Sequence, residues 1–334
     1  MPRPGTAPII DACQYCNWSP EILRELRAGR VDAISVTICY HEDFRETVEQ
    51  LIDWNRRFER HADLILAGRS SADIDRARVT GKTAVFLASQ NPSCIEDDIG
   101  LVEVLHTLGI RVMQLTYNNQ SLLGTGCYEA NDTGITRMGR EVIAEMNRLG
   151  MLIDMSHSAE RTTREAIDLS SRPIAITHAN PRAWHDVVRN KSDAVLKALT
   201  ARGGMLGLSL YPYHLQGGSA CPVTGFAEMA ARLAERIGID NIGIGSDLCQ
   251  GHGDGIIEWM RVGRWTKAPP TSALGAAVLP PQPDWFRDNR DWEKIRAGLI
   301  AHGFSEADAG KILGGNWHRF FAASFEPEAA GART

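Results

Sequence analysis

Two histidines stand where a metal ion could be held between them. His157 follows the apolar stretch that begins at Met151, and His178 follows the stretch that begins at Pro173. Two histidines at the ends of successive parallel strands can face each other and bind one zinc ion through neutral imidazole nitrogens. Asp247 follows a third apolar stretch, where a carboxylate can ligate the same ion and transfer a proton to or from an attacking water. The alternative is that each histidine is an ordinary buried or loop residue.

Two further side chains have the chemistry to act on a substrate beside such an ion. Arg189 could form two parallel hydrogen bonds to a substrate carboxylate, although its segment Val187–Asp193 could equally be the solvated approach to a helix. Tyr117 follows another apolar stretch, and its phenol is a neutral donor that could bind a developing oxyanion. The alternative for Tyr117 is an aromatic side chain that only lines the site.

The remaining candidates are additional ligands at other strand ends. Cys13 and Cys16 form a Cys-x-x-Cys pair that could complete a mixed Cys/His metal site, that could be two structural thiols, or that could supply a nucleophile. His41 could be a substitute ligand. Asp11 and Gln90 also stand at strand ends and are possible members of the site.

Eight short apolar runs must position these groups. Each is continuously apolar rather than alternating, which is typical of parallel strands that are covered on both faces. The eight expected strands are 8–11, 33–39, 83–89, 111–116, 151–155, 173–177, 204–209 and 241–246. Helical patterns lie between most of them, so the chain alternates β and α elements. Eight such units favour a closed (β/α)₈ TIM-type barrel, in which the carboxyl ends of the strands carry the active site.

Local signals place several of the helices. Ser19, Pro20 and Glu21 are an N-cap, a first-turn proline and a first-turn acid, and that helix should end near Gly29. Helical spacing also predicts helices over 95–108, 136–149, 291–302 and 305–313. We expect a single barrel domain over residues 1–324 with a lid-like loop at about 250–290, followed by a frayed tail over 325–334.

Composition excludes several classes of protein. The chain has 334 residues, a net charge of -5 and no basic block, which argues against a nucleic-acid partner or an anionic membrane surface. No apolar run approaches the ~18 residues of a transmembrane helix, and the first residues do not have the pattern of a secretory signal. Seven thinly spread cysteines do not suggest a disulfide scaffold, so we expect a cytoplasmic protein.

Several longer motifs carry a family resemblance. They include Gln114-Leu115-Thr116-Tyr117-Asn118, Gly139-Arg140-Glu141-Val142, Met146-Asn147-Arg148-Leu149-Gly150-Met151, Asp154-Met155-Ser156-His157, Thr177-His178, Arg189-Asn190, Gly245-Ser246-Asp247 and Gly314-Gly315-Asn316-Trp317. Together they resemble the membrane dipeptidase (renal dipeptidase) family of zinc peptidases. The resemblance implies an amidohydrolase-like barrel with its metal site at the strand ends, and the hydrolysis of dipeptides, often with a D-residue at the C-terminal position.

The family's site residues match this sequence only in part. The resemblance implies metal ligands at His157, His178 and Asp247, and a substrate-carboxylate arginine at Arg189. The family's first-strand His-x-Asp pair falls on Cys13 and Tyr15, its bridging glutamate on Gln90, and its substrate-polarising histidine on Tyr117. These departures are similar to those of a bacterial subgroup of the family.

The departures limit the expected cofactor. Two dications ~3.5–4 Å apart need bridging anions to offset their repulsion, and Gln90 cannot supply one. We therefore expect at most one zinc, or another divalent ion, per chain. The expected function is a metallodipeptidase-like hydrolase acting on a dipeptide or an N-acyl amino acid. The sequence is compatible with a homo-oligomer. The alternative is a degenerate barrel that binds a small zwitterion without hydrolysing it.

Overall fold

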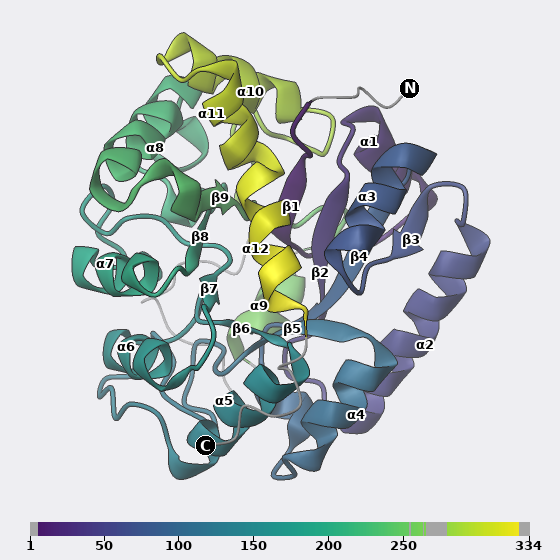
Figure 1. The fold of residues 1–334 in the computed structure, drawn as a ribbon, viewed down its shortest axis with the longest axis vertical. Coiled ribbons are helices and arrows are strands. Elements are labelled where there is room, and N and C mark those ends of the chain that lie inside the picture. Colours follow the sequence, from purple (N-terminus) through teal and green to yellow (C-terminus); the bar gives the residue numbers. More distant parts are fainter. Residues whose placement is uncertain (1–5, 254, 263, 265–278, 327–334) are drawn as a thin grey trace.

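A closed ring of eight parallel strands forms the centre of the protein in the computed structural model, which describes residues 6–253, 255–262, 264 and 279–326 (Figure 1). The ring runs β1-β2-β4-β5-β6-β7-β8-β9 and closes through the pairing of β2 with β4 and of β1 with β9. The strands of the ring are β1 (Ile10–Gln14), β2 (Ala33–Cys39), β4 (Thr83–Ser89), β5 (Ile110–Gln114), β6 (Leu152–Asp154), β7 (Ala175–Ile176), β8 (Met205–Leu208) and β9 (Ile242–Ile244). The predicted TIM-type barrel is confirmed, and each ring strand lies on one of the eight predicted runs.

One strand was not predicted. β3 (Ile65–Ala67) pairs with the beginning of β4, on the edge where β5 pairs with the end of β4. Because β3 has only three residues, it leaves no periodic signal in the sequence.

The helices form an outer layer around the ring. They are α1 (Pro20–Ala28), α2 (Phe44–Arg60), α3 (Ser71–Thr80), α4 (Gly100–Leu108), α5 (Arg137–Leu149), α6 (Glu160–Leu169), α7 (Asp193–Ala201), α8 (Val223–Ile237), α9 (Gly255–Val262), α10 (Trp292–Ala301), α11 (Glu306–Gly310) and α12 (Asn316–Ser324). The Ser19 hydroxyl accepts from the backbone N–H of Ile22 at the start of α1, as the N-cap signal predicts. None of the helices in the described part of the chain combines the length and the apolar character that crossing a bilayer requires.

The predicted helix over 95–108 is too long at its N-terminal end. A short 3₁₀ helix occupies Pro92–Ile95, and α4 begins only at Gly100. Glu96 has a φ of 51°, in the left-handed region, so the chain cannot continue one helix through this position.

The amino-terminal end of the barrel is closed by α12. Its aromatic residues Trp317, Phe320 and Phe321 are buried with inward-facing residues of the strands, among them Ile10 and Phe86. The Trp317 indole donates to the Ile244 carbonyl at 2.9 Å. A Cβ atom on Gly243 would lie 2.2 Å from the same indole nitrogen, so only glycine allows this approach. This core leaves the carboxyl ends of the strands free to form a site.

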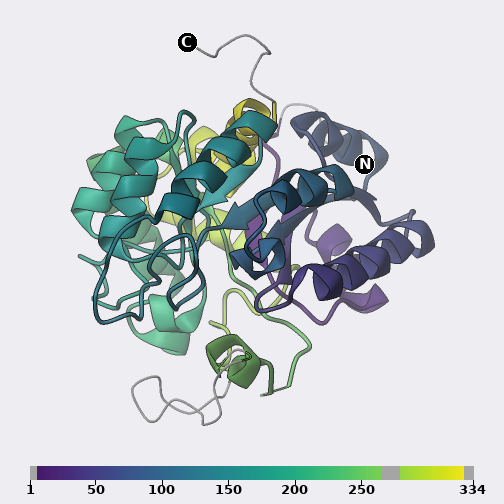
Figure 2. The same cartoon turned by 90° about the horizontal axis from the view of Figure 1, so that it is seen from below.

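The segment predicted as a lid-like loop is partly helical. Helix α9 lies within it, on the side of the barrel opposite α12 (Figure 2). His41 contacts α9 through the Met260 carbonyl, 3.3 Å from the imidazole Nε2. Residues 265–278 of the predicted loop lie outside the described residues, as do residues 327–334 of the predicted tail.

Candidate active site at the barrel mouth

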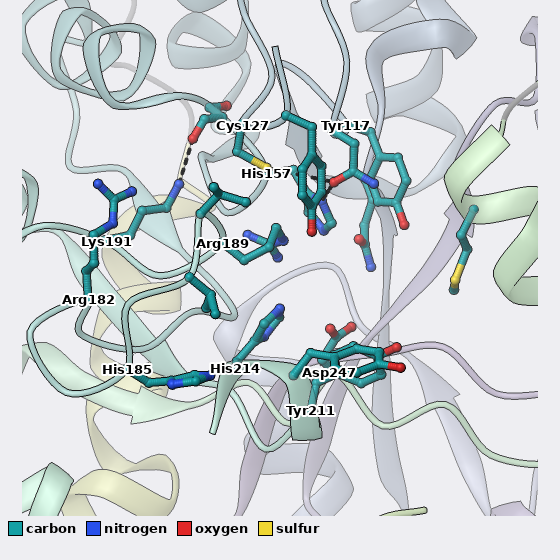
Figure 3. Close-up of a pocket in the computed structure, with 18 of the residues that line it drawn as sticks. Tyr117, Cys127, His157, Arg182, His185, Arg189, Lys191, Tyr211, His214 and Asp247 are labelled. Atoms are coloured by element: carbon teal, nitrogen blue, oxygen red, sulfur yellow. Dashed lines mark hydrogen bonds between the residues drawn. The ribbon is translucent and has the colours of Figure 1, made fainter. Parts of the chain in front are cut away.

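A large cavity opens among the loops that follow the strands (Figure 3). Its volume is about 1280 Å³, and its lining includes the predicted residues Gln90, Tyr117, His157, Arg189 and Asp247. All six tyrosines of the chain line it: Tyr15, Tyr40, Tyr117, Tyr128, Tyr211 and Tyr213. The predicted position of the site is therefore matched by a cavity whose walls combine aromatic rings with a few ionisable groups.

The hydrogen bond that Nδ1 makes in each of His157 and His178 fixes which ring nitrogen carries the proton. His157 Nδ1 lies 2.7 Å from Asn118 Oδ1, which can only accept, so Nδ1 is the protonated nitrogen. His178 Nδ1 lies 2.8 Å from the hydroxyl of Thr177. That hydroxyl donates its own proton to Asp154, so it accepts from His178 Nδ1–H. Both histidines therefore have an unprotonated Nε2.

Asp154 fixes the direction in which the Thr177 hydroxyl donates its proton. It is fully buried and accepts four hydrogen bonds, from the backbone N–H and hydroxyl of Ser156 and from the same two groups of Thr177. An ionised carboxylate accepts in this way, and it leaves the Thr177 oxygen no choice but to accept from His178. Asp154 was not predicted as a site residue, because its role depends on contacts between β6 and β7 that the sequence does not reveal.

The two unprotonated nitrogens face each other. His157 Nε2 and His178 Nε2 are 3.0 Å apart, and His178 lies completely buried behind the lining of the cavity. Burial is the main cause that holds the pKa of both imidazoles well below its usual range, with the nearby Arg189 adding to it, so both rings are neutral. Two lone pairs directed at each other without a proton between them repel, and a cation relieves that repulsion. These residues therefore fit a metal ion.

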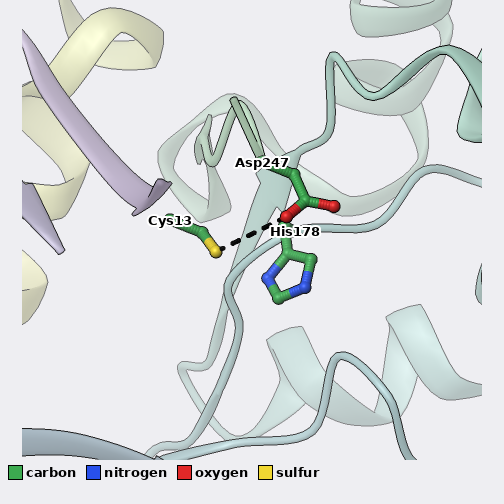
Figure 4. Close-up of side chains that lie close together, drawn as sticks. All are labelled: Cys13, His178 and Asp247. Carbon is green, nitrogen blue, oxygen red and sulfur yellow. Dashed lines mark hydrogen bonds between the residues drawn. The ribbon is translucent and has the colours of Figure 1, made fainter. Parts of the chain in front are cut away.

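Asp247 completes a group of ligands. An oxygen of Asp247, a nitrogen of His178 and the sulfur of Cys13 all lie within 4.8 Å of one another, a group that does not include His157. Figure 4 shows these three side chains. Asp247 has a φ of 57°, in the left-handed region, and its backbone N–H donates to the Cys13 carbonyl at 2.9 Å. Burial raises the pKa of this carboxyl to about 7, opposed by Arg189. No second group of three such ligands was found in the part of the chain that the structure describes.

Arg189 and Lys191 are buried, so the alternative of a solvated helix approach is wrong. Both are less than 5% exposed. The Arg189 guanidinium donates to the backbone carbonyl of Ser156 and lies 3.5 Å from that of His178. Figure 3 shows it reaching into the space between His157 and His214. Lys191, which was not predicted as a site residue, donates to two backbone carbonyls, and burial lowers its pKa to about 7.

Tyr117 lies against one ring of the histidine pair. Its ring centroid is 4.2 Å from that of His157, and 4.9 Å from that of Tyr40. Burial, with the carboxylate of Asp247 as a smaller cause, holds the pKa of the Tyr117 phenol well above its usual range. The phenol is therefore protonated and can donate a hydrogen bond into the cavity.

Two of the additional candidates, Asp11 and His41, have partners of their own. Asp11 is fully buried, is not part of the cavity lining, and accepts from the Gln14 amide and from the backbone and hydroxyl of Ser246. His41 has its ring between Tyr117 and the carbonyl of Met260. Asp11 supports two strand ends, and neither Asp11 nor His41 belongs to the ligand group of Asp247.

The two cysteines of the Cys-x-x-Cys pair have different neighbours. Cys13 belongs to the ligand group, whereas Cys16 Sγ lies 3.5 Å from the Leu248 carbonyl. Both thiols are free. The amide nitrogen of Gln90 lies 3.3 Å from the Cys13 sulfur. The structure therefore gives the two members of one sequence motif different environments.

Comparison with known proteins gives a consistent result. Residues 21–265 match the family described as membrane dipeptidase, peptidase family M19. A solved structure described as an amidohydrolase from Pseudomonas aeruginosa is 33% identical, with a TM-score of 0.91 over 96% of this chain and 97% of that chain. A metallo peptidase from Rhodobacter sphaeroides, solved with a phosphinate mimic of the dipeptide L-Ala-D-Ala, has a TM-score of 0.77 over 96% of this chain and 99% of that chain. At 18% identity it shows the shared fold only.

The curated relatives are longer than this chain. Dipeptidase tcpJ of Claviceps purpurea is 25% identical over 280 residues, which are 83% of this chain and 59% of that protein. Dipeptidase verJ of Clonostachys rogersoniana is 26% identical over 214 residues, which are 64% of this chain and 55% of that protein. The chain thus spans between half and three fifths of the length of these relatives.

Proposed function

The chain belongs to the membrane dipeptidase family, and from this premise we propose that it is a metal-dependent hydrolase that cleaves the amide bond of a dipeptide or an N-acyl amino acid. The observation that carries the proposal is the pair of unprotonated Nε2 atoms of His157 and His178, 3.0 Å apart, beside the carboxylate of Asp247. Neutral imidazoles and a carboxylate are the ligand types of a catalytic zinc site.

His157, His178 and Asp247 would hold one ion, and zinc suits this set of nitrogen and oxygen donors best. When bound there, zinc polarises a carbonyl oxygen and lowers the pKa of a bound water. We expect no more than one ion per chain. Gln90, which faces the site from β4, is an amide and cannot balance the charge of a second dication.

The protein groups have separate roles toward the substrate. Asp247 accepts a proton from the attacking water and returns it to the leaving nitrogen, because its carboxyl group lines the cavity beside the two histidines. Arg189 binds the carboxylate of the substrate through its guanidinium. Tyr117 donates its phenolic proton in a hydrogen bond to the oxygen of the scissile carbonyl as negative charge develops on it.

The cavity also bears on substrate size. A volume of about 1280 Å³ is larger than a dipeptide fills, and its tyrosines offer apolar faces with polar edges. N-acyl amino acids with a bulky acyl group therefore fit the cavity as well as dipeptides do.

The cellular setting that we propose is a reducing one, the cytoplasm. All seven cysteines are free, and Cys13 and Cys16 are not joined although only two residues separate them. Free thiols persist where glutathione and thioredoxin keep them reduced.

The test is a turnover screen on metal-free and zinc-loaded protein. We expect one equivalent of zinc to restore hydrolysis of dipeptides with an L or D C-terminal residue or of N-acyl amino acids. The released amino acid would be detected by chromatography. The substrate panel should include carboxyl-blocked analogues as a control. Protein that stays metal-free in excess zinc while binding amino-acid-like ligands would contradict the proposal and would establish a binding barrel.

A further inference from the structure

Cys13 has surroundings that differ from those of an ordinary buried thiol. Its sulfur is 3.8 Å from Asp247 Oδ1, and it lies within 4.8 Å of a ligand nitrogen of His178 (Figure 4). Ligand atoms around one tetrahedral ion, at metal–ligand distances of about 2.0–2.3 Å, are separated by distances of this order. The three atoms can therefore share one ion with little movement.

Gln90 places a donor nitrogen beside this sulfur. Its side-chain nitrogen lies 3.3 Å from Cys13 Sγ, 2.8 Å from the Thr37 hydroxyl and 3.2 Å from the Tyr40 phenol, so its two N–H groups are shared among three acceptors. The nitrogen, not the oxygen, of the amide group faces the sulfur. A donor in this position suits a thiolate, which accepts hydrogen bonds more strongly than a thiol does.

The carboxylate of Asp247 lies 3.8 Å from the same sulfur, so a thiolate at Cys13 would need a cation beside it. A buried thiolate next to a buried carboxylate is unfavourable unless a positive charge lies between them. Arg189 does not fill this place, because its guanidinium donates to the Ser156 carbonyl. A divalent ion bound to both would leave the group of two anionic ligands and one dication neutral.

We propose that Cys13 is a thiolate ligand of the metal ion, together with His178 and Asp247. The inference rests on the single ion of the proposed function and makes that centre a mixed sulfur, nitrogen and oxygen site. On binding, the S–H bond of Cys13 breaks, the sulfur donates an electron pair to the ion, and the proton leaves to solvent. A thiolate ligand favours zinc, cobalt and cadmium over magnesium and manganese.

Cobalt(II) in place of zinc gives a direct readout, because a thiolate bound to cobalt(II) produces a charge-transfer absorption in the near ultraviolet. Metal-free wild-type protein titrated with cobalt chloride should develop this band and reach saturation at one equivalent. Cys13→Ser should lose the band, and its zinc affinity should fall by more than about 100-fold. Substituting even a residue that only hydrogen-bonds to a metal ligand lowers metal affinity by about 10–100-fold. One bound cobalt without the band in the wild type would overturn the inference.

Cys16→Ser is the matched control. Cys16 is as buried as Cys13 and belongs to the same Cys-x-x-Cys pair, but its sulfur lies 3.5 Å from the Leu248 carbonyl and is not part of the ligand group of Asp247. This variant should keep the full band. Cys249→Ser tests the other thiol of the cavity near Asp247 and should also keep it. Loss of the band in either of these variants, with Cys13→Ser unaffected, would contradict the assignment.

A second measurement needs no variant and covers the case in which Cys13→Ser does not fold. X-ray absorption at the zinc edge of wild-type protein should show one sulfur neighbour at about 2.3 Å. A shell of nitrogen and oxygen alone would refute the thiolate ligand. Zinc-dependent hydrolysis with such a shell would leave the proposed function intact, whereas a sulfur ligand without any hydrolysis would contradict the function and retain the ligand.

Discussion

The two halves of the barrel mouth share one architecture but carry different chemistry. The ends of β1, β2 and β4 bring neutral groups to the cavity, represented by Tyr15, Tyr40 and Gln90. The strand ends from β6 to β9 bring His157, His178 and Asp247. Burial is similar on both sides, so the difference lies in side-chain type. An ion should therefore be held mainly by the second half, with Cys13 as the one contribution from the first.

Both halves contain a buried carboxylate that joins adjacent strand ends. Asp11 accepts from Ser246 across β1 and β9, and Asp154 accepts from Thr177 across β6 and β7. Asp154 also orients His178 through the Thr177 hydroxyl, whereas Asp11 has no histidine to orient. A buried carboxylate thus connects neighbouring strands on both sides, and on only one side does it also orient a histidine.

The largest effect is expected from the second half. His178→Ala should remove metal binding and all hydrolysis, because His178 belongs both to the histidine pair and to the ligand group of Asp247. Metal content by elemental analysis and turnover would be measured together. His302→Ala, at an exposed position after α10, is the control and should match the wild type. Retention of one tightly bound metal in His178→Ala would place the ion elsewhere.

The next effect concerns substrate recognition. Arg189→Ala should lower kcat/KM for substrates with a free carboxylate by about 1.5–3 kcal/mol, the range for a charge-assisted hydrogen bond. Carboxyl-blocked substrates should be nearly indifferent, which separates recognition from any loosening of the Ser156 and His178 backbone. An equal loss for both substrate types would mean that Arg189 acts only by supporting the site.

A substitution at the ends of β1, β2 and β4 tests whether the neutral side chains there affect stability and metal binding. Gln90→Glu replaces the amide donor with a carboxylate beside Cys13, Thr37 and Tyr40, so we expect the metal-free protein to lose about 1–2 kcal/mol of stability. A second metal should bind only partially, since Cys13 and Tyr15 do not provide a second set of carboxylates and imidazoles. Urea unfolding and metal content measure the two effects. Two full equivalents would show that the missing acid alone prevents a two-metal centre.

The smallest effect is a pH dependence. Burial lowers the pKa of Lys191 to about 7 from 10.5, so between these values the unfolded chain binds a proton that the folded chain does not. The contribution of Lys191 to the free energy of unfolding should therefore rise from pH 7 to pH 10.5 and stay constant below pH 7. The difference between wild type and Lys191→Met, measured by urea unfolding of metal-free protein, should show this slope. Lys197→Met, at an exposed position, should not alter the wild-type profile.

The barrel was predictable because its strands are continuous apolar runs. Ala33–Cys39 and Thr83–Ser89 coincide with predicted runs to the residue. β3 was missed because three residues carry no period, and α4 was predicted too long because nothing in the sequence marks the left-handed Glu96. Helix α9 lies within the predicted lid-like loop and was not predicted from the sequence.

The candidate site was predictable in residue type but not in orientation. His157 and Asp247 do lie at the cavity, as their places after apolar runs suggest, and so does Arg189. The direction of each lone pair depends on Asn118, and on Thr177 through its bond to Asp154, which are contacts between neighbouring strand ends. A sequence pattern records which residues follow a strand, but it does not record these cross-strand hydrogen bonds.

The confinement of all six tyrosines to one cavity makes this protein suited to chemical footprinting. A reagent that nitrates phenol rings, such as tetranitromethane, would nitrate tyrosines only at this cavity, because the chain has no tyrosine elsewhere. Tyr128 and Tyr213 are more than 40% exposed and should react first, whereas Tyr40 and Tyr117 are buried. Protection of the first pair by a bound molecule would therefore report occupancy of the cavity without any knowledge of the reaction that takes place there.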